Sequence, residues 1–371
     1  MRVRRLAVTG AIAAAGGFAA VSGTAFAASP FIAPPGTVTT IASTVPGNGD
    51  VNPYGVAVVG EDTGRLVKGR VLVSNFNAKT NLQGTGTTIV QVDPRTKSRR
   101  LFAQVDRKHL PGPCPGGVGL TTALSVLPGG WVVVGSLPTT DGTSATAKAG
   151  CLLVLDRWGT VRETIAGHGI NGPWDMTAVG DEHHANLFVT NVPNGTVAAR
   201  GTTVNGGTVV RIGLSLDRHR PPAVDDITVI GSRFGERTDP AALVVGPTGV
   251  AVGRDDTLFV ADSVGNRITM IPDADTRHRS AGTGPTVTTG GALNTPLGLA
   301  VVPNGDVLTM NAGDGNMVET TPGGAQVATL TLDGSGSPAG AGTLFGLAPV
   351  PGHHAVYFVD DGTNTLNLVV R

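Results

Sequence analysis

Short apolar runs, each ended by a polar or glycine-rich turn, recur along the chain from Thr37 to the C-terminus. The clearest example is the segment 246–271. Its parts in order are Val250–Val252, the acidic turn Asp255–Asp256, Leu258–Ala261, the polar stop Asp262 and Arg267–Ile271. Two short apolar strands joined by an acidic turn are typical of a β-hairpin. The pattern predicts an all-β chain.

The same pattern returns in the segment 295–311. In both copies a glycine that opens the first strand precedes a polar stop by the same interval, Gly249 before Asp262 and Gly298 before Asn311. Six such openings can be aligned, at Gly55, Ala123, Asp175, Gly249, Gly298 and Gly346. A period near 50 residues with four short strands per repeat is typical of a β-propeller rather than a solenoid. A β-sandwich would not explain the register of the repeats.

The first five repeats each contain a fourth strand, whereas the sixth ends at its third, Thr365–Val370. A strand-like segment without a hairpin partner, Thr37–Thr44, stands at the other end of the predicted ring. It can supply the missing outer strand and leave no open sheet edge. We therefore predict a six-bladed β-propeller over residues 37–371, with its last blade closed by the N-terminal strand.

Residues 247–268 resemble the NHL repeat, which joins a Pro-x-Gly-hydrophobic-Ala opening to a Val-Ala-Asp-x-x-Asn-x-Arg-Ile hairpin. The resemblance implies a propeller of a kind that commonly serves in recognition. Gluconolactonase-like propellers are more distantly similar, and hold a divalent metal with a Glu, an Asn and an Asp. This chain has Asn52-Pro-Tyr-Gly55 where those enzymes carry a Glu-Gly-Pro pattern.

The resemblance also points to NHL-type amidating lyases, which bind zinc through several histidines. The histidine pairs of this chain, His183-His184 and His353-His354, fall in turns between the first and second strands. Those turns lie on the propeller face opposite the polar stops, so we expect solvated turns there.

The N-terminus has the pattern of a bacterial-type export signal. Three arginines among the first five residues precede an Ala- and Gly-rich apolar run, and Ala25-Phe26-Ala27 supplies a cleavage site. We read residues 1–27 as a removed signal, with a retained membrane anchor as the alternative, and residues 28–36 as a Pro-rich leading segment. No later run is long enough to cross a membrane. The mature protein is therefore expected to be extracellular, monomeric and free of the membrane.

A formal net charge of zero argues against nucleic acid as a partner. The two cysteines, Cys114 and Cys151, form no Cys-x-x-Cys motif and suit an oxidising compartment. Both fall on the polar-stop face of the second repeat. We therefore predict a disulfide between them, with a Cα separation below about 7 Å.

A binding site is expected around the channel on the polar-stop face. The polar stops that would form this rim are Asn75, Ser136, Asn191, Asp262, Asn311 and Asp360. The alternative is that each side chain caps backbone N–H groups in its own turn. Asp175 stands where the other repeats carry Gly or Ala, so we consider it a candidate functional residue. The alternative is that its side chain makes a local structural bond.

Calcium is the candidate cofactor, because it accepts six to eight oxygen ligands at loosely defined angles. Asp175, Asn191, Asp262 and Asn311 are the ligands that we would name. His168 precedes Asp175 by seven positions and completes a candidate catalytic set with it.

Long links between the second and third strands of repeats one to three build up one side of the polar-stop face. The first hypothesis is an extracellular binding scaffold for a protein, a glycan or a small ligand. The alternative is a lactonase-like, metal-dependent hydrolase or lyase at the channel mouth. A deep acidic channel would favour the enzyme, and a shallow apolar face would favour the scaffold.

Overall fold

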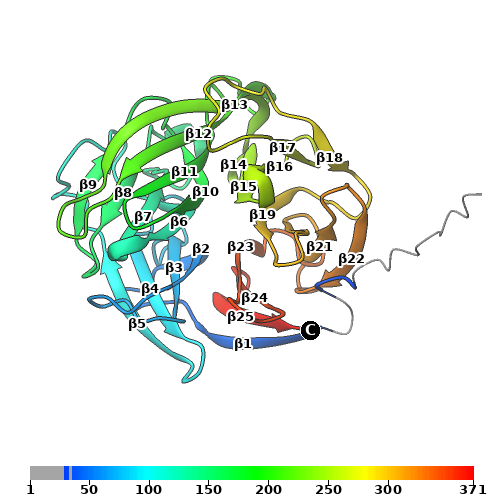
Figure 1. Cartoon of the computed structure of the whole chain (residues 1–371), viewed down its shortest axis with the longest axis horizontal. Coiled ribbons are helices and arrows are strands. Elements are labelled where there is room, and N and C mark those ends of the chain that lie inside the picture. Colours follow the sequence, from blue (N-terminus) through cyan, green and yellow to red (C-terminus); the bar gives the residue numbers. More distant parts are fainter. Residues whose placement is uncertain (1–28, 33–35) are drawn as a thin grey trace, which may run out of the picture.

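The computed structural model describes residues 29–32 and 36–371, which form six antiparallel sheets around a central axis (Figure 1). Each sheet is one blade, and its first strand lines the axis. The prediction of an all-β, six-bladed β-propeller is confirmed. Within the described ranges helical structure is limited to three short 3₁₀ turns, η1 (Pro128–Gly130), η2 (Ser144–Thr146) and η3 (Arg254–Asp256). None of them could span a membrane.

Three blades come from the first two thirds of the chain. Blade one contains β2 (Val51–Val58), β3 (Val71–Asn77), β4 (Thr88–Asp93) and β5 (Ser98–Gln104). Blade two contains β6 (Leu120–Leu127), β7 (Trp131–Ser136), β8 (Cys151–Leu155) and β9 (Val161–Ile165). Blade three contains β10 (Pro173–Gly180), β11 (His184–Asn191), β12 (Val204–Ser215), β13 (Ala223–Asp239) and β14 (Leu243–Val245).

The other three blades follow with shorter links. Blade four contains β15 (Pro247–Val252), β16 (Leu258–Asp262), β17 (Arg267–Ile271) and β18 (Thr286–Thr289). Blade five contains β19 (Pro296–Val301), β20 (Val307–Asn311), β21 (Asn316–Thr320) and β22 (Gln326–Thr331). Blade six contains β23 (Leu344–Pro349), β24 (Ala355–Asp360), β25 (Thr365–Val370) and β1 (Thr37–Ser43).

The ring closes by pairing its two ends. Strand β1 pairs antiparallel with β25, from Thr37 opposite Val370 to Ser43 opposite Thr365. Figure 1 shows β1 as the outer strand of the last blade, beside the C-terminus. This confirms the predicted closure, which removes the open edge that a three-stranded last blade would leave.

Blade three differs from the expected four-stranded unit. Strands β12 and β13 are unusually long, and β13 continues past β12 to pair with the short strand β14. The sequence pattern gave Gly207–Ile212 and Asp226–Ile230 for these two strands, so it found their centres and missed their extensions and β14. The extra strand returns the chain to the axis on the face of the polar stops.

Hydroxyl groups join the first strands of neighbouring blades. The Ser74 hydroxyl accepts the Gly55 N–H at 2.9 Å and donates to the Thr121 carbonyl of blade two at 2.8 Å. The Thr190 hydroxyl does the same from blade three, accepting the Asp175 N–H at 3.0 Å and donating to the Thr248 carbonyl at 2.8 Å. These bonds fix neighbouring first strands to each other in the buried interior.

Part of the Pro-rich leading segment is docked on blade five. Phe31 and Ile32 are buried, and their N–H groups donate to the Glu319 carboxylate at 2.6 and 2.8 Å. A carboxylate that accepts two backbone N–H groups is a strong acceptor. The export signal predicted over residues 1–27 lies outside the described residues.

Candidate functional site

The six first strands enclose an axial cavity of about 290 Å³. Its wall is formed by the second halves of these strands, and extends to their last residues in β15, β19 and β23. The cavity therefore opens toward the face that carries the turns between first and second strands, which we call the turn face. The opposite face carries the polar stops and is the polar-stop face.

The axis is filled near the polar-stop face by four aromatic side chains, the aromatic plug: Tyr54, Phe76, Trp174 and Phe345. The ring centroid of Tyr54 lies 3.9 Å from that of Phe345 and 4.6 Å from that of Phe76, in stacked geometry. Trp174 meets Tyr54 edge-on at 5.7 Å. All four are buried. Aromatic pairs with ring centroids about 4.5–7 Å apart, such as Tyr54 with Phe76 and with Trp174, contribute about 0.5–1.5 kcal/mol beyond their area burial.

Residues from the long links cover the plug. Leu137, Val192, Leu243 and Val244 belong to the same buried cluster, and follow the second strands of blades two and three or lie in β14. The raised side of the polar-stop face, which we predicted to be a binding rim, thus forms a lid over the plug. The accessible part of the channel lies beyond the plug, toward the turn face.

Asp175 is the one titratable residue in the wall of the axial cavity, across the described part of the chain. Its carboxylate accepts the Val250 N–H of blade four at 3.1 Å. Burial raises the pKa of this carboxyl to about 7, against the lowering effect of the Met176 and Val250 N–H groups. The rest of the wall is apolar, backbone or hydroxyl, with Thr122, Ser125 and Thr177 as its hydroxyl side chains.

The local packing explains why an aspartate at this position is unusual. At the aligned openings, a Cβ on Gly298 would overlap the Phe345 carbonyl, and one on Gly346 would overlap the Tyr54 carbonyl. These first strands approach each other too closely for a side chain. At Asp175 the side chain instead reaches the next blade and bonds to its backbone. Its structural role is to connect blades three and four.

The predicted rim residues are all buried. Asp262 accepts the Gly265 N–H at 3.1 Å and the Arg267 Nε–H at 2.8 Å, and Asp360 accepts the Thr363 N–H at 3.0 Å. The Ser136 hydroxyl accepts the Gly119 N–H at 3.0 Å and donates to the Gly117 carbonyl at 2.9 Å. These bonds belong to turns and links of the residue's own blade.

The asparagines at the polar stops bond to backbone groups of segments that precede them in the chain. The Asn75 amide donates to the Thr44 carbonyl at 3.2 Å, and the Asn311 amide to the Ala292 carbonyl at 2.8 Å. The Asn191 side-chain oxygen accepts the Asn171 N–H at 3.3 Å. Asp262 and Asp360 thus cap N–H groups of their own turns, as the turn-capping alternative predicts, whereas the other four polar stops bond to backbone groups of preceding segments. Their role in ligand binding stays a prediction.

The four predicted calcium ligands do not form one ligand set. Asp175 faces the cavity, whereas Asn191, Asp262 and Asn311 bond within three separate blades, and no hydrogen bond joins two of the four. Within the described ranges, no three His, Cys, Asp or Glu side chains are grouped as metal ligands would be. These donors do not fit a calcium ion at the predicted position, and we derive no step through one.

His168 and Asp175 are not brought together. His168 is exposed in a tight turn before blade three, with a positive φ of 53°, and it does not line the cavity. The histidine pairs are exposed as expected, although the His354 ring stacks on Phe31 at 5.1 Å. The two residues of the candidate catalytic set therefore occupy different environments.

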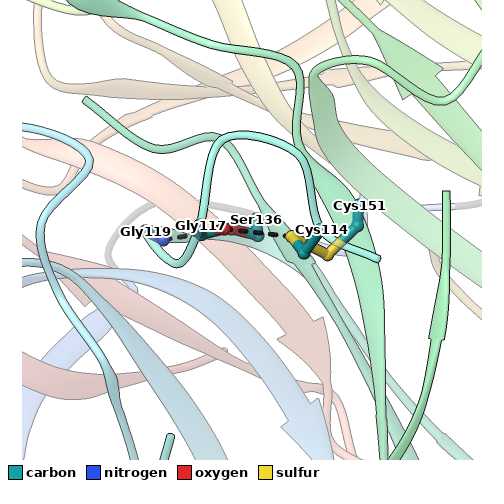
Figure 2. The surroundings of a disulfide bond; sticks show 5 residues. All are labelled: Cys114, Gly117, Gly119, Ser136 and Cys151. Carbon is teal, nitrogen blue, oxygen red and sulfur yellow. Dashed lines mark hydrogen bonds between the residues drawn. A yellow bond between two sulfur atoms is a disulfide. The ribbon is translucent and has the colours of Figure 1, made fainter. Parts of the chain in front are cut away.

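The predicted disulfide between Cys114 and Cys151 is present, with a Cα separation of 5.2 Å. Figure 2 shows it beside the loop that leads into blade two, next to the Ser136 bonds to Gly117 and Gly119. Cys151 begins β8 and Cys114 lies in the loop, so the bond fastens that loop to the blade. The disulfide and the Ser136 hydrogen bonds together hold this part of the polar-stop face in place.

The aromatic plug is the feature that our sequence analysis missed. Its signal was present, because Tyr54, Trp174 and Phe345 each directly precede an aligned opening position, and Leu297 does so in blade five. A large apolar residue recurring at the position before the opening predicts side chains that meet on the axis.

No protein-family model and no curated protein matches the chain. Several solved structures are similar to it. A gluconolactonase from Xanthomonas campestris is 12% identical with a TM-score of 0.56, and the match covers 90% of this chain and 89% of that one. A luciferin-regenerating enzyme is 13% identical with a TM-score of 0.56, covering 91% and 95%.

The calcium-binding protein regucalcin from Agrobacterium tumefaciens is 11% identical with a TM-score of 0.55, covering 88% of this chain and 92% of its own. None of these similarities identifies the NHL repeat, which stays a resemblance of sequence. At such low identity they show the fold alone. The chain thus shares the six-bladed β-propeller fold of gluconolactonase and regucalcin.

Proposed function

We propose that this protein is an extracellular binding protein that admits one small, mostly apolar amine into its axial cavity, where the amine pairs with Asp175. The observation that supports this is a single carboxyl group in an otherwise uncharged wall. Ligand pockets are usually apolar with a few polar groups that fix orientation, and measure about 300–1,000 Å³. A cavity of about 290 Å³ lies just below this range, which suits a small ligand.

The chemistry of Asp175 selects an amine over a neutral molecule. Its pKa of about 7 reflects burial without a neighbouring cation. A ligand ammonium group would supply that cation and offset the desolvation of the carboxylate, whereas an uncharged ligand would leave the penalty in place. Affinity should therefore rise as the pH increases through about 7, because Asp175 must lose its proton to form the pair.

Our proposal places the ligand in the axial cavity, whereas the scaffold hypothesis from the sequence placed it on the polar-stop face. Residues from the links of blades two and three and from β14 cover the aromatic plug on the polar-stop face. The axial cavity lies on the other side of the plug, toward the turn face. The extracellular location still depends on the export signal predicted over residues 1–27.

The metal-dependent, lactonase-like hydrolase or lyase with calcium is the second candidate. A carboxyl group with a pKa near 7 suits general acid–base catalysis, which is the observation in its favour. The similarity to a gluconolactonase concerns the fold. Such an enzyme would need metal ligands other than the four that we predicted.

The experiment uses the chain from residue 28 onward, purified without chelator. Ligand-detected NMR with a panel of small alkyl amines, the matching alcohols and a set of lactones would be run on the unmodified chain and on Asp175→Asn. Asp255→Asn, in an exposed turn, is the matched control. We expect amines alone to bind, with at least a tenfold loss in Asp175→Asn, equal to about 1.4 kcal/mol.

Equal binding of amines and alcohols, or unchanged amine binding in Asp175→Asn, would refute the amine proposal. Metal analysis of the same sample by mass spectrometry addresses the second candidate. About one calcium ion per chain together with lactone hydrolysis would replace the binding proposal by the enzyme.

A further inference from the structure

A second hollow, of about 330 Å³, lies on the turn face between blades two and three. Three turns meet around it: Pro128–Gly130, the β8–β9 turn, and the link between β12 and β13. Its wall contains two tryptophans, three arginines and one histidine, namely Trp131, Trp158, Arg157, Arg162, Arg218 and His219. It is separate from the axial cavity, and shares no lining residue with it.

Two glycines form a tight turn beside the arginines. Gly129 and Gly130 have φ values of 78° and 82°. A Cβ on Gly129 would lie 3.3 Å from the Arg218 Cγ, and one on Gly130 would lie 3.0 Å from the Arg157 Cβ and overlap the Thr63 methyl group. The glycine turn therefore runs between the two arginine stems. Trp131, behind it, donates its indole N–H to the Asp217 carbonyl at 2.8 Å and so holds the β12–β13 link against blade two.

Trp158 presents its indole ring to solvent. It is 55% exposed, whereas Trp131 is 6% and Trp174 2% exposed. Its backbone is fixed, because Asp156 accepts the N–H groups of both Trp158 and Thr160, at 2.9 and 3.0 Å. An exposed tryptophan on a fixed turn beside a hollow is a surface on which a flat ring can stack.

The ion pairs around the hollow leave one arginine of its wall without a carboxylate partner among the described residues. Arg162 pairs with Asp156 at 2.6 Å, and Arg218 pairs with Glu182 at 3.3 Å. Arg157 has no ion pair with any described residue. The Glu61 carboxylate accepts the Gly129 N–H at 2.8 Å at the margin. With Glu61 counted, three carboxylates balance the three arginines, so the hollow has no excess positive charge and disfavours a dianion such as phosphate, while Arg157 is the arginine left to pair with a single carboxylate.

We propose that this hollow binds a six-membered ring that bears one carboxylate, with the ring stacked on Trp158 and the carboxylate paired with Arg157. A guanidinium group presents N–H donors in a planar fork that matches a carboxylate. Indole faces accept both the apolar face of a sugar ring and an aromatic ring. The shared chemistry therefore covers a sugar acid and an aromatic acid, which the experiment distinguishes.

The test uses the fluorescence of Trp158, which is the accessible tryptophan of the three. Glucuronate and benzoate would be titrated against their uncharged counterparts, glucose and benzyl alcohol, while acrylamide quenching is measured. We expect one of the acids to protect Trp158 from acrylamide, and neither neutral compound to do so. Protection by glucuronate identifies a sugar acid, and protection by benzoate an aromatic acid.

Arg157→Gln is the test variant, and Arg220→Gln on the neighbouring link is its control, since Arg220 is exposed, pairs with Asp217 and does not line the hollow. We expect about a tenfold loss of acid affinity in Arg157→Gln and less than about a twofold change in Arg220→Gln. Isothermal titration of Trp158→Ala should show a loss as well. Equal losses in both arginine variants, equal protection by the neutral compounds, or no protection by either acid would overturn the proposal.

Discussion

The two ends of the central channel are built from the same six strands and yet have opposite properties. Near the polar-stop face, Tyr54, Phe76, Trp174 and Phe345 fill the axis and are covered by the long links. Toward the turn face, the same strands carry aliphatic and hydroxyl side chains and leave a cavity with one carboxyl group. The backbone of a propeller provides a channel, and the side chains decide which half of it stays open.

The strongest test of this contrast is to remove the largest side chain of the plug. Trp174→Ala should lower the free energy of unfolding by about 3–5 kcal/mol, because it deletes a buried aromatic residue and leaves a cavity under a rigid lid. Val301→Ala, in the open wall, should cost only about 1 kcal/mol, because that side chain is half-buried. Urea denaturation followed by circular dichroism measures both. Equal losses would show that the two ends are packed alike.

Removing the disulfide tests how much a covalent bond stabilises the polar-stop face. Replacing both Cys114 and Cys151 by Ser should lower the free energy of unfolding by about 2–4 kcal/mol, because the bond closes a loop of 37 residues. Denaturation of the oxidised protein, with and without the substitutions, gives the difference. Ligand binding in the axial cavity should be unchanged, since neither cysteine lines it. A loss of binding would contradict the separation of the two ends.

Three carboxyl groups with raised pKa values should make the stability depend on pH. Burial raises the pKa values of Asp175, Glu236 and Asp361 to about 7, and Asp360 contributes further at Asp361. Between about pH 4 and pH 7 the folded chain holds protons that the unfolded chain has released, so stability falls as the pH rises through this range. We expect a free energy of unfolding on the order of 1–3 kcal/mol lower at about pH 8 than at about pH 5.

Denaturation midpoints across this range, with Asp175→Asn as the comparison, check the prediction. The variant should show a shallower fall, because it lacks one of the three groups. Aspartates with lowered pKa values, such as Asp93 and Asp226, act in the opposite direction, but only in more acidic solution. A stability that rises between pH 5 and pH 8 would contradict the burial of these groups.

The smallest expected effect concerns the Thr190 hydroxyl, which connects Asp175 in β10 to Thr248 in β15. Thr190→Val keeps the shape of the side chain and removes its bonds to the Asp175 N–H and the Thr248 carbonyl. The cost should be about 1–2 kcal/mol, since two buried backbone groups lose a partner. Thermal unfolding compared with Thr363→Val, near the surface of blade six, measures it. An unchanged melting temperature would mean that this bond does not hold blades three and four together.

The sequence by itself determined the number of blades, their order, the closure by the N-terminal strand and the disulfide. These depend on periodic apolar strands, on a missing fourth strand in the last repeat and on two cysteines in one repeat, all of which are local or repeating signals. It also identified Asp175 as the residue that departs from the repeat.

The tertiary structure alone decided where an accessible site could exist. Which side chains meet on the axis depends on residues from blades one, three and six, more than 100 positions apart in the sequence, packing in one layer. The hydrogen-bond partner of each polar-stop side chain likewise depends on which nearby backbone groups have no partner in a strand. The repeated apolar position before each opening marks candidates for the axis, but packing and hydrogen-bond satisfaction depend on neighbours in space and are settled only by the fold.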